Sequence, residues 1–134
     1  MPGYSGTPLP KKLGIKDGFN ALLVNAPDDV VAGLKQSLDH CKLVHDRNTP
    51  LDFAMLFTKS AANLNKDFKR IAKQLAPSGM LWVSWPKKSS GVPTDLTDNV
   101  VREIGLAAGL VDVKVCAVTD AWSGLKFVRR LKDR

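Results

Sequence analysis

Residues 19–29 read Phe19-Asn20-Ala21-Leu22-Leu23-Val24-Asn25-Ala26-Pro27-Asp28-Asp29, and this segment is the most informative about the fold. Its apolar centre is continuous rather than alternating, as in a strand buried on both faces of a parallel sheet. Pro27 suits the first position of a helix, and the two acids suit its first turn, where they face the positive end of the helix dipole. The stretch therefore predicts a buried parallel strand that leads into a helix.

The same strand-then-helix pattern recurs along the chain. Ser60 is typical of a helix N-cap, and Thr94 or Asp95 is expected to cap a further helix. Pro77-Ser78-Gly79 and Gly109 are expected to end these helices. The other expected strands are residues 42–45, 51–57, 80–85, 111–118 and 125–131. The expected buried helix faces are Val30, Val31, Leu34 and Leu38; Leu64, Phe68, Ile71, Ala72 and Leu75; and Leu96, Val100, Ile104, Ala107 and Ala108.

This order predicts an α/β fold, a three-layer Rossmann-like and mostly parallel sheet that closes with an antiparallel strand pair. We expect residues 1–134 to form one domain, because a chain of 134 residues supports a single core. Residues 1–12 are expected to be an irregular N-terminal segment, with a short helical turn around 9–13 that Gly14 ends.

Composition narrows the function classes. The chain is 44% hydrophobic and 25% charged, with a net charge of +7 that lies mostly in residues 68–134. No apolar run reaches the roughly 18 residues of a membrane span, and no signal-peptide pattern is visible, so we expect a cytoplasmic protein without membrane contact. The two cysteines, Cys41 and Cys116, are expected to be reduced. The aromatic residues fall inside apolar runs, which argues against nucleic acid as a partner.

The carboxyl ends of the predicted strands carry the candidate site, because ligands bind there in open parallel sheets. The loop of residues 86–93 follows one such end and offers an aromatic face, charge and hydroxyl groups. An anionic or aromatic small molecule is the expected partner; a solvated basic turn with Trp85 as a packing residue is the alternative. The candidate ligand-binding residues are Trp85, Lys87, Lys88, Ser89 and Ser90 in and before this loop, and Asn25, Thr58, Lys59 and Ser60 at the same edge.

Asp46 is a further candidate, because it lies 21 residues past Asn25, where an acid can bind ribose hydroxyls in nucleotide-binding folds. The alternative is an acid that stabilises the turn before Asn48-Thr49-Pro50. No metal site is expected, since His40, Cys41 and His45 have no second cluster to complete a ligand set.

Two resemblances follow from particular stretches. Residues 12–24, the Pro77-Ser78-Gly79 turn before a later strand, and the closing antiparallel pair resemble class I S-adenosylmethionine-dependent methyltransferases. Residues 3–9, 81–88 and 101–112 are similar to a family of short bacterial Rossmann-like proteins of unknown function. Both resemblances imply the fold, and neither carries catalytic residues over to this chain.

The chain departs from the methyltransferase pattern at residues 25–29, where that family has a glycine-rich turn. Glycines there let the backbone approach the cofactor closely, and Pro27 removes one potential donor. The first hypothesis is therefore a non-catalytic small-molecule-binding or interaction module with a degenerate cofactor turn. The alternative is a small S-adenosylmethionine-dependent methyltransferase-like or nucleotide-binding enzyme. The sequence does not identify the cofactor, and no catalytic residue stands out.

Overall fold

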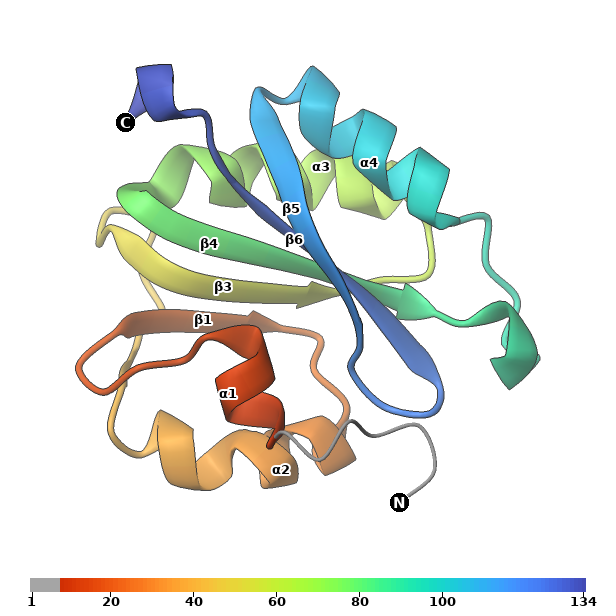
Figure 1. Ribbon diagram of the computed structural model, residues 1–134, viewed down its shortest axis with the longest axis horizontal. Helices are drawn as coiled ribbons and strands as arrows, with labels where there is room; N and C mark the ends of the chain where they lie inside the picture. Colours follow the sequence, from red (N-terminus) through yellow and green to blue (C-terminus); the bar gives the residue numbers. More distant parts are fainter. Residues whose placement is uncertain (1–7) are drawn as a thin grey trace.

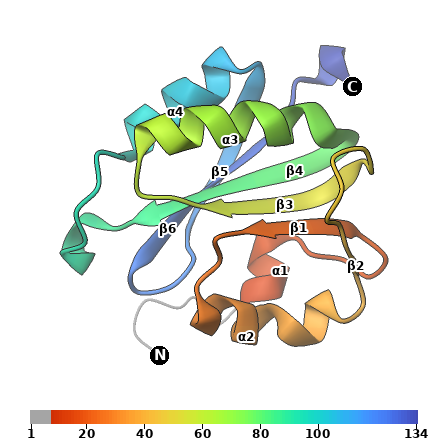
Figure 2. The same ribbon diagram turned by 180° about the vertical axis from the view of Figure 1, so that it is seen from behind.

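A computed structural model describes residues 8–134 as a six-stranded sheet between two layers of helices (Figure 1). The strand order is β2-β1-β3-β4-β6-β5. Helices α1 and α2 cover one face and α3 and α4 the other, which is clearest from behind (Figure 2). The elements are α1 (Leu9–Leu13), β1 (Asn20–Val24), α2 (Asp28–Leu38), β2 (Lys42–Leu43), β3 (Leu51–Phe57), α3 (Ala61–Gln74), β4 (Leu75–Pro86), a 3₁₀ turn (Lys88–Ser90), α4 (Asp98–Ala107), β5 (Leu110–Ala117), β6 (Trp122–Arg129) and a second 3₁₀ turn (Leu131–Asp133).

The sheet confirms the predicted fold class. β1 pairs in parallel with β2 and β3, and β3 pairs in parallel with β4. β6 runs antiparallel to both β4 and β5. β3 is almost wholly buried, and so is β4 from Leu81 onward, as their continuous apolar runs require.

The two helix layers bury most of the predicted faces. Leu64, Phe68 and Ile71 of α3 are fully buried, and Phe68 meets Phe127 of β6 edge to face. Val31 was expected on the buried face of α2, but its side chain is 39% exposed. It follows Val30, which is buried, by one position, and 100° of helix rotation turns it away from the sheet.

The predicted turn at Pro77-Ser78-Gly79 is wrong, because β4 begins at Leu75, directly after α3. A Cβ atom on Gly79 would collide with the carbonyl oxygen of Leu51, so only glycine lets the two strands approach here. The register between β3 and β4 shifts between Leu51 and Phe53, at the same place.

The expected caps of α4 are also wrong. Thr97, rather than Thr94 or Asp95, caps this helix and accepts a hydrogen bond from the N–H of Val100. Thr94 instead donates to the carbonyl oxygen of Lys59 at 2.6 Å, and the Asp95 carboxylate accepts from the N–H of Ala61 at 2.9 Å. The loop before α4 therefore supplies hydrogen-bond partners to backbone groups at and just before the start of α3.

The closing strand begins and ends earlier than predicted. β6 spans Trp122–Arg129, so residues 122–124 belong to the strand and the chain turns before them. The helical turn expected around residues 9–13 is present as α1, and the part of the expected irregular segment over 1–7 lies outside the described residues. Gly14 ends α1 in the left-handed conformation, as expected. Nowhere in residues 8–134 is a helix long and apolar enough to cross a membrane.

Candidate functional site

The chain reverses its direction of winding at β1. It passes from β1 to β2 on one side, then crosses to β3 on the other. The carboxyl ends of β1 and β3 therefore flank a topological switch point, which is where open α/β sheets bind their ligands. Two pockets open at this edge of the sheet.

The first, the switch pocket, has a volume of about 390 Å³. The structure brings together here Asn25 from the end of β1 and Thr58, Lys59 and Ser60 from the end of β3. Parallel strands share a carboxyl edge, so their spacing in the sequence was enough to predict this meeting. The pocket is lined by Asn25, Phe57, Thr58, Lys59, Ser60, Asn63, Asp67 and Trp122.

Asn25 gives the turn after β1 a glycine-like shape. Its φ is 57°, and within residues 8–134 it is the one residue other than glycine with a positive φ. Asparagine enters this left-handed region more readily than most residues. A residue other than glycine thus supplies the left-handed backbone conformation at the turn after β1. Pro27 stands at the N-cap of α2, which no side chain caps.

Phe57 and Trp122 are pocket residues that the sequence did not indicate. Their rings pack edge to face with centroids 5.2 Å apart, so the β5–β6 turn is folded over the end of β3. Trp122 stands beside Ser123 and Gly124, between two predicted strands, and an aromatic residue at such a turn was the available signal. Phe57 closes an apolar run and looked like ordinary core.

The second, the loop pocket, has a volume of about 680 Å³. Trp85, Lys87 and Lys88 line it, as the sequence predicts for a site at the end of this strand. Ser89 and Ser90 do not line it, and the Ser90 hydroxyl donates to the carbonyl oxygen of Lys87 at 2.6 Å. The remaining lining comes from Pro86, Gly91, Val92, Pro93, Thr94, Leu96, Thr97, Asp98, Val115 and Ser123.

Trp85 is only 5% exposed and belongs to the core between the sheet and α3 and α4. The Trp85 side chain therefore packs in the core, as in the alternative interpretation, and only its small exposed part borders the loop pocket.

The two pockets are neighbours. Lys59 lines the switch pocket and Thr94 the loop pocket, and the hydrogen bond from the Thr94 hydroxyl to the Lys59 carbonyl joins their walls. Trp122 and Ser123 are consecutive residues of β6, so their side chains point to opposite faces of the sheet, and each lines a different pocket.

Asp46 does not join this edge. Its carboxylate accepts hydrogen bonds from the N–H groups of Asn48 and Thr49 and from the Thr49 hydroxyl, at 2.7–2.8 Å. These bonds, led by that from the Thr49 N–H, lower the pKa of Asp46 below its usual value. Gln74, at the end of α3, donates to the carbonyl oxygens of Asp46 and Thr49 and holds the loop there. The geometry is that of a turn-stabilising acid.

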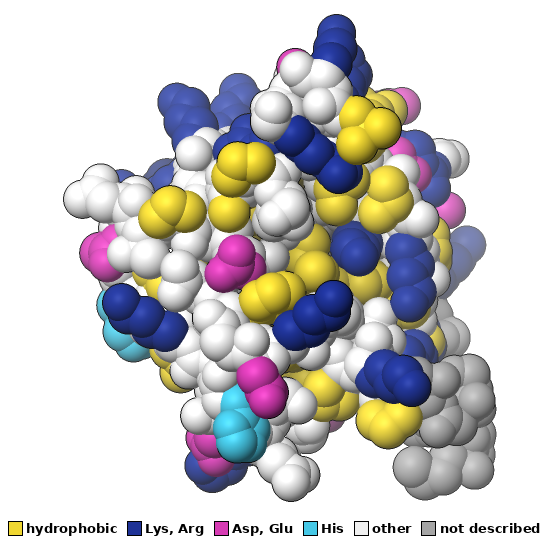
Figure 3. All heavy atoms as spheres, turned by 60° about the vertical axis from the view of Figure 1, so that its left-hand side comes forward, with side chains coloured by type: hydrophobic (Ala, Val, Ile, Leu, Met, Phe, Trp, Pro, Cys, Tyr) yellow, Lys and Arg dark blue, Asp and Glu magenta, His cyan; other side chains and the backbone are white. Residues whose placement is uncertain are grey.

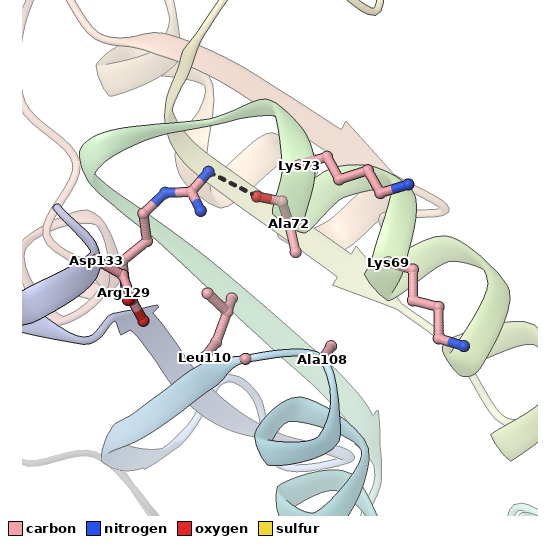
Figure 4. A pocket seen from close by; sticks show the side chains of 8 residues that line it. Lys69, Ala72, Lys73, Ala108, Leu110, Arg129 and Asp133 are labelled. Carbon is pink, nitrogen blue, oxygen red and sulfur yellow. Dashed lines mark hydrogen bonds between the residues drawn. The ribbon is translucent and has the colours of Figure 1, made fainter.

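A third hollow of about 320 Å³ lies at the opposite edge, near the end of α3 (Figure 4). Arg129 lines this hollow, and its guanidinium donates hydrogen bonds to the carbonyl oxygens of Ala72 and Leu75 at 2.9 and 2.7 Å. Lys69 and Lys73 extend along α3 away from Arg129. Arg129 thus satisfies carbonyls that the end of a helix leaves open, which is a structural role.

Comparison with known proteins supports the fold. No protein-family model matches the sequence, and no curated protein matches it either. Many solved structures do match in three dimensions.

Three of them illustrate the likeness. Magnesium protoporphyrin IX methyltransferase from Synechocystis PCC 6803, solved with bound S-adenosylmethionine, superposes with a TM-score of 0.59 at 10% identity over 91% of this chain and 74% of that one. Mitomycin 7-O-methyltransferase superposes with a TM-score of 0.60 at 11% identity, over 91% of this chain and 53% of that one. An S-adenosylmethionine-dependent methyltransferase from Aquifex aeolicus superposes with a TM-score of 0.55 at 15% identity, over 87% of this chain and 85% of that one. The chain therefore has a Rossmann-like fold distantly similar to that of class I S-adenosylmethionine-dependent methyltransferases.

Proposed function

We propose that this protein binds S-adenosylmethionine in the switch pocket and a methyl acceptor in the loop pocket, as a small methyltransferase-like enzyme. The observation that carries the proposal is the meeting of Asn25 with Thr58, Lys59 and Ser60 in one pocket at the switch point. The likeness to solved structures that hold this cofactor supports it.

The residues of the switch pocket suit such a cofactor in part. Asn25 holds the backbone in the conformation that a glycine would supply, and a volume of about 390 Å³ is within the range of small-molecule sites. The hydroxyl of Thr58, the amide of Asn63 and the carboxylate of Asp67 offer polar partners for ribose, ammonium and carboxylate groups. The cofactor supplies a methyl group on a sulfonium, which would pass to a nucleophilic atom of the acceptor and leave S-adenosylhomocysteine and a proton.

The role of this chain would be to orient the two molecules. The hydrogen bond from the Thr94 hydroxyl to the Lys59 carbonyl links the linings of the two pockets, which have no residue in common. Holding reactants in contact supplies a large part of the rate of a transfer reaction. The half-buried Trp122, which lines the switch pocket, also limits the access of water to it.

Calorimetric titration with S-adenosylmethionine and S-adenosylhomocysteine tests the proposal. We expect micromolar binding to the wild type. Asn63→Trp should fill the switch pocket and weaken binding by at least about tenfold, or 1.4 kcal/mol. Ala62→Trp adds the same bulk one position away, outside the pocket lining, and should bind as the wild type does. Absence of heat and of a thermal shift with either compound would contradict the proposal.

A second candidate is a non-catalytic module that binds an anionic or aromatic small molecule in the loop pocket. Two observations favour it: residues 25–29 contain no glycine, and the Asp46 carboxylate is used within its own turn. A panel of aromatic carboxylates, screened by thermal shift, is the probe. Lys87→Ala with Lys88→Ala should weaken any compound found while leaving the melting temperature of the free protein nearly unchanged. Unchanged affinity in this variant would remove the second candidate.

A further inference from the structure

Four lysines, here called the lysine face, lie around the side of the β5–β6 hairpin that faces α1: Lys114 of β5, Lys126 of β6, Lys12 of α1, and Lys87 directly after β4. Lys114 and Lys126 stand directly opposite each other in the antiparallel pair. Like charges in such positions repel across the strands and destabilise the sheet. The presence of two lysines at facing positions therefore needs a physical reason.

A bulge in β5 removes the nearest acid from this side. The register with β6 shifts between Asp112 and Lys114, so Val113 is an extra residue and its neighbours point to opposite faces of the sheet. Asp112 is thereby turned toward α4, where its carboxylate accepts from Arg102 at 2.9 Å. In a regular strand, Asp112 and Lys114 would share a face.

Helix α1 adds a further cation. The Lys12 ammonium donates to the carbonyl oxygen of Ala117 at 3.0 Å, and the Lys114 ammonium donates to the carbonyl oxygen of Lys12 at 3.0 Å. Both ammonium groups are thus held by backbone carbonyls, which position them without neutralising their charge. The three ion pairs within residues 8–134 involve none of the four lysines.

The charges act on one another and on one thiol. Burial lowers the pKa of Lys126, and the charge of Lys114 lowers it further. At Cys116, burial raises the pKa, while the charges of Lys12, Lys114 and Lys87 oppose that rise. The four lysines are therefore concentrated in one region around the β5–β6 hairpin. The basic excess of the chain is visible on the side drawn in Figure 3, where Lys and Arg side chains gather toward the top and right.

We propose that the lysine face binds a compact polyanion of the di- or triphosphate type. The cations converge on two facing strand positions and the end of α1 rather than forming a stripe along a groove. Trp82, the aromatic residue of β4 paired with Lys126, is fully buried and offers no ring for a base to stack on. Closely spaced phosphates would offset the repulsion between Lys114 and Lys126. This site meets the loop pocket only at Lys87, and none of its other lysines lines the loop pocket or the switch pocket.

Calorimetric titration with inorganic tripolyphosphate at physiological ionic strength tests this site. We expect saturable binding with one site per chain. Lys114→Gln with Lys126→Gln should weaken it at least tenfold. The matched control is Lys69→Gln with Lys73→Gln, which removes the same charge from two exposed lysines of α3 and should bind like the wild type. The melting temperature of the free Lys114/Lys126 variant should stay near that of the wild type, because the removed repulsion offsets the loss of the hydrogen bond from Lys114 to the Lys12 carbonyl.

Three outcomes would overturn the proposal. The first is absence of saturable binding to the wild type. The second is an equal loss in both double variants, which would mean attraction to net charge alone. The third is tighter binding of a single-stranded oligonucleotide than of tripolyphosphate, with a steep dependence on salt, which would mean a nucleic-acid surface. The titrations with S-adenosylmethionine are independent of this result.

Discussion

The turns that follow β1 and β3 leave adjacent parallel strands at the same edge, and each enters a helix, yet they are built differently. The start of α3 is satisfied by protein: Ser60 accepts from the N–H of Asn63, and Asp95 accepts from the N–H of Ala61. The start of α2 has Pro27 and two acids but no side-chain cap. Side chains thus hold the start of α3, one of them Asp95 from the loop before α4, whereas the turn after β1 depends on the backbone conformation of Asn25. The difference indicates that the β3–α3 side of the switch pocket is held by more side-chain hydrogen bonds than the β1–α2 side.

Removing both side-chain acceptors at the start of α3 should lower the stability of the protein most. Ser60→Ala together with Asp95→Ala should destabilise the protein by about 2 kcal/mol, because each change leaves one N–H of α3 without its acceptor. The matched change at α2, Asp29→Ala, removes only a charge near the helix dipole and should cost about 0.5 kcal/mol. Urea denaturation measures both. Equal losses would mean that the two turns do not differ in this way.

A smaller effect is expected at Asn25. Asn25→Ala should destabilise the protein by about 1 kcal/mol, since alanine enters the left-handed region at a higher cost. Asn25→Gly should be as stable as the wild type or slightly more so, because glycine adopts this conformation freely. Thermal denaturation of the pair checks the reason for the effect. A loss of stability in both variants would point to the Asn25 side chain instead of its backbone.

The least change in stability is expected at the turn after β2, which the Asp46 carboxylate stabilises by hydrogen bonds. The pKa of Asp46 is lowered in the folded state, so its contribution to stability is present above its usual value near 3.8 and is lost as pH falls through the folded-state value. The melting temperature of Asp46→Ala should therefore lie below that of the wild type at pH 7, and the gap should narrow in strong acid. A gap that stays constant with pH would exclude the carboxylate as its cause.

Sequence patterns were sufficient for the layers and the sheet because long apolar runs such as residues 51–57 must be buried on both faces. They failed where a residue serves a distant neighbour. Thr94 looked like a cap of the next helix but bonds to Lys59, and Gly79 looked like a turn but lets β4 approach Leu51. Such contacts depend on which strands become adjacent, and local spacing does not carry that information.

The candidate site was predictable to a similar degree. Asn25, Thr58, Lys59 and Ser60 meet because the ends of parallel strands must meet. Asp46 had the expected spacing, yet β2 ends at Leu43 and the chain then turns back toward the end of α3. The tripeptide Asp46-Arg47-Asn48, followed by Thr49, was already a signal for the turn that the structure contains.

The position of β6 between β4 and β5 has a consequence for biosynthesis. β5 leaves the ribosome before β6, yet it has no partner in the sheet until β6 is in place. The edge of β4 stays open during this interval, as a row of unpaired backbone groups that could capture another nascent chain. β5 and β6 therefore join the sheet together, as a hairpin that pairs with β4 once β6 has been made. A nascent chain halted before Trp122 should be the form that depends most on a chaperone.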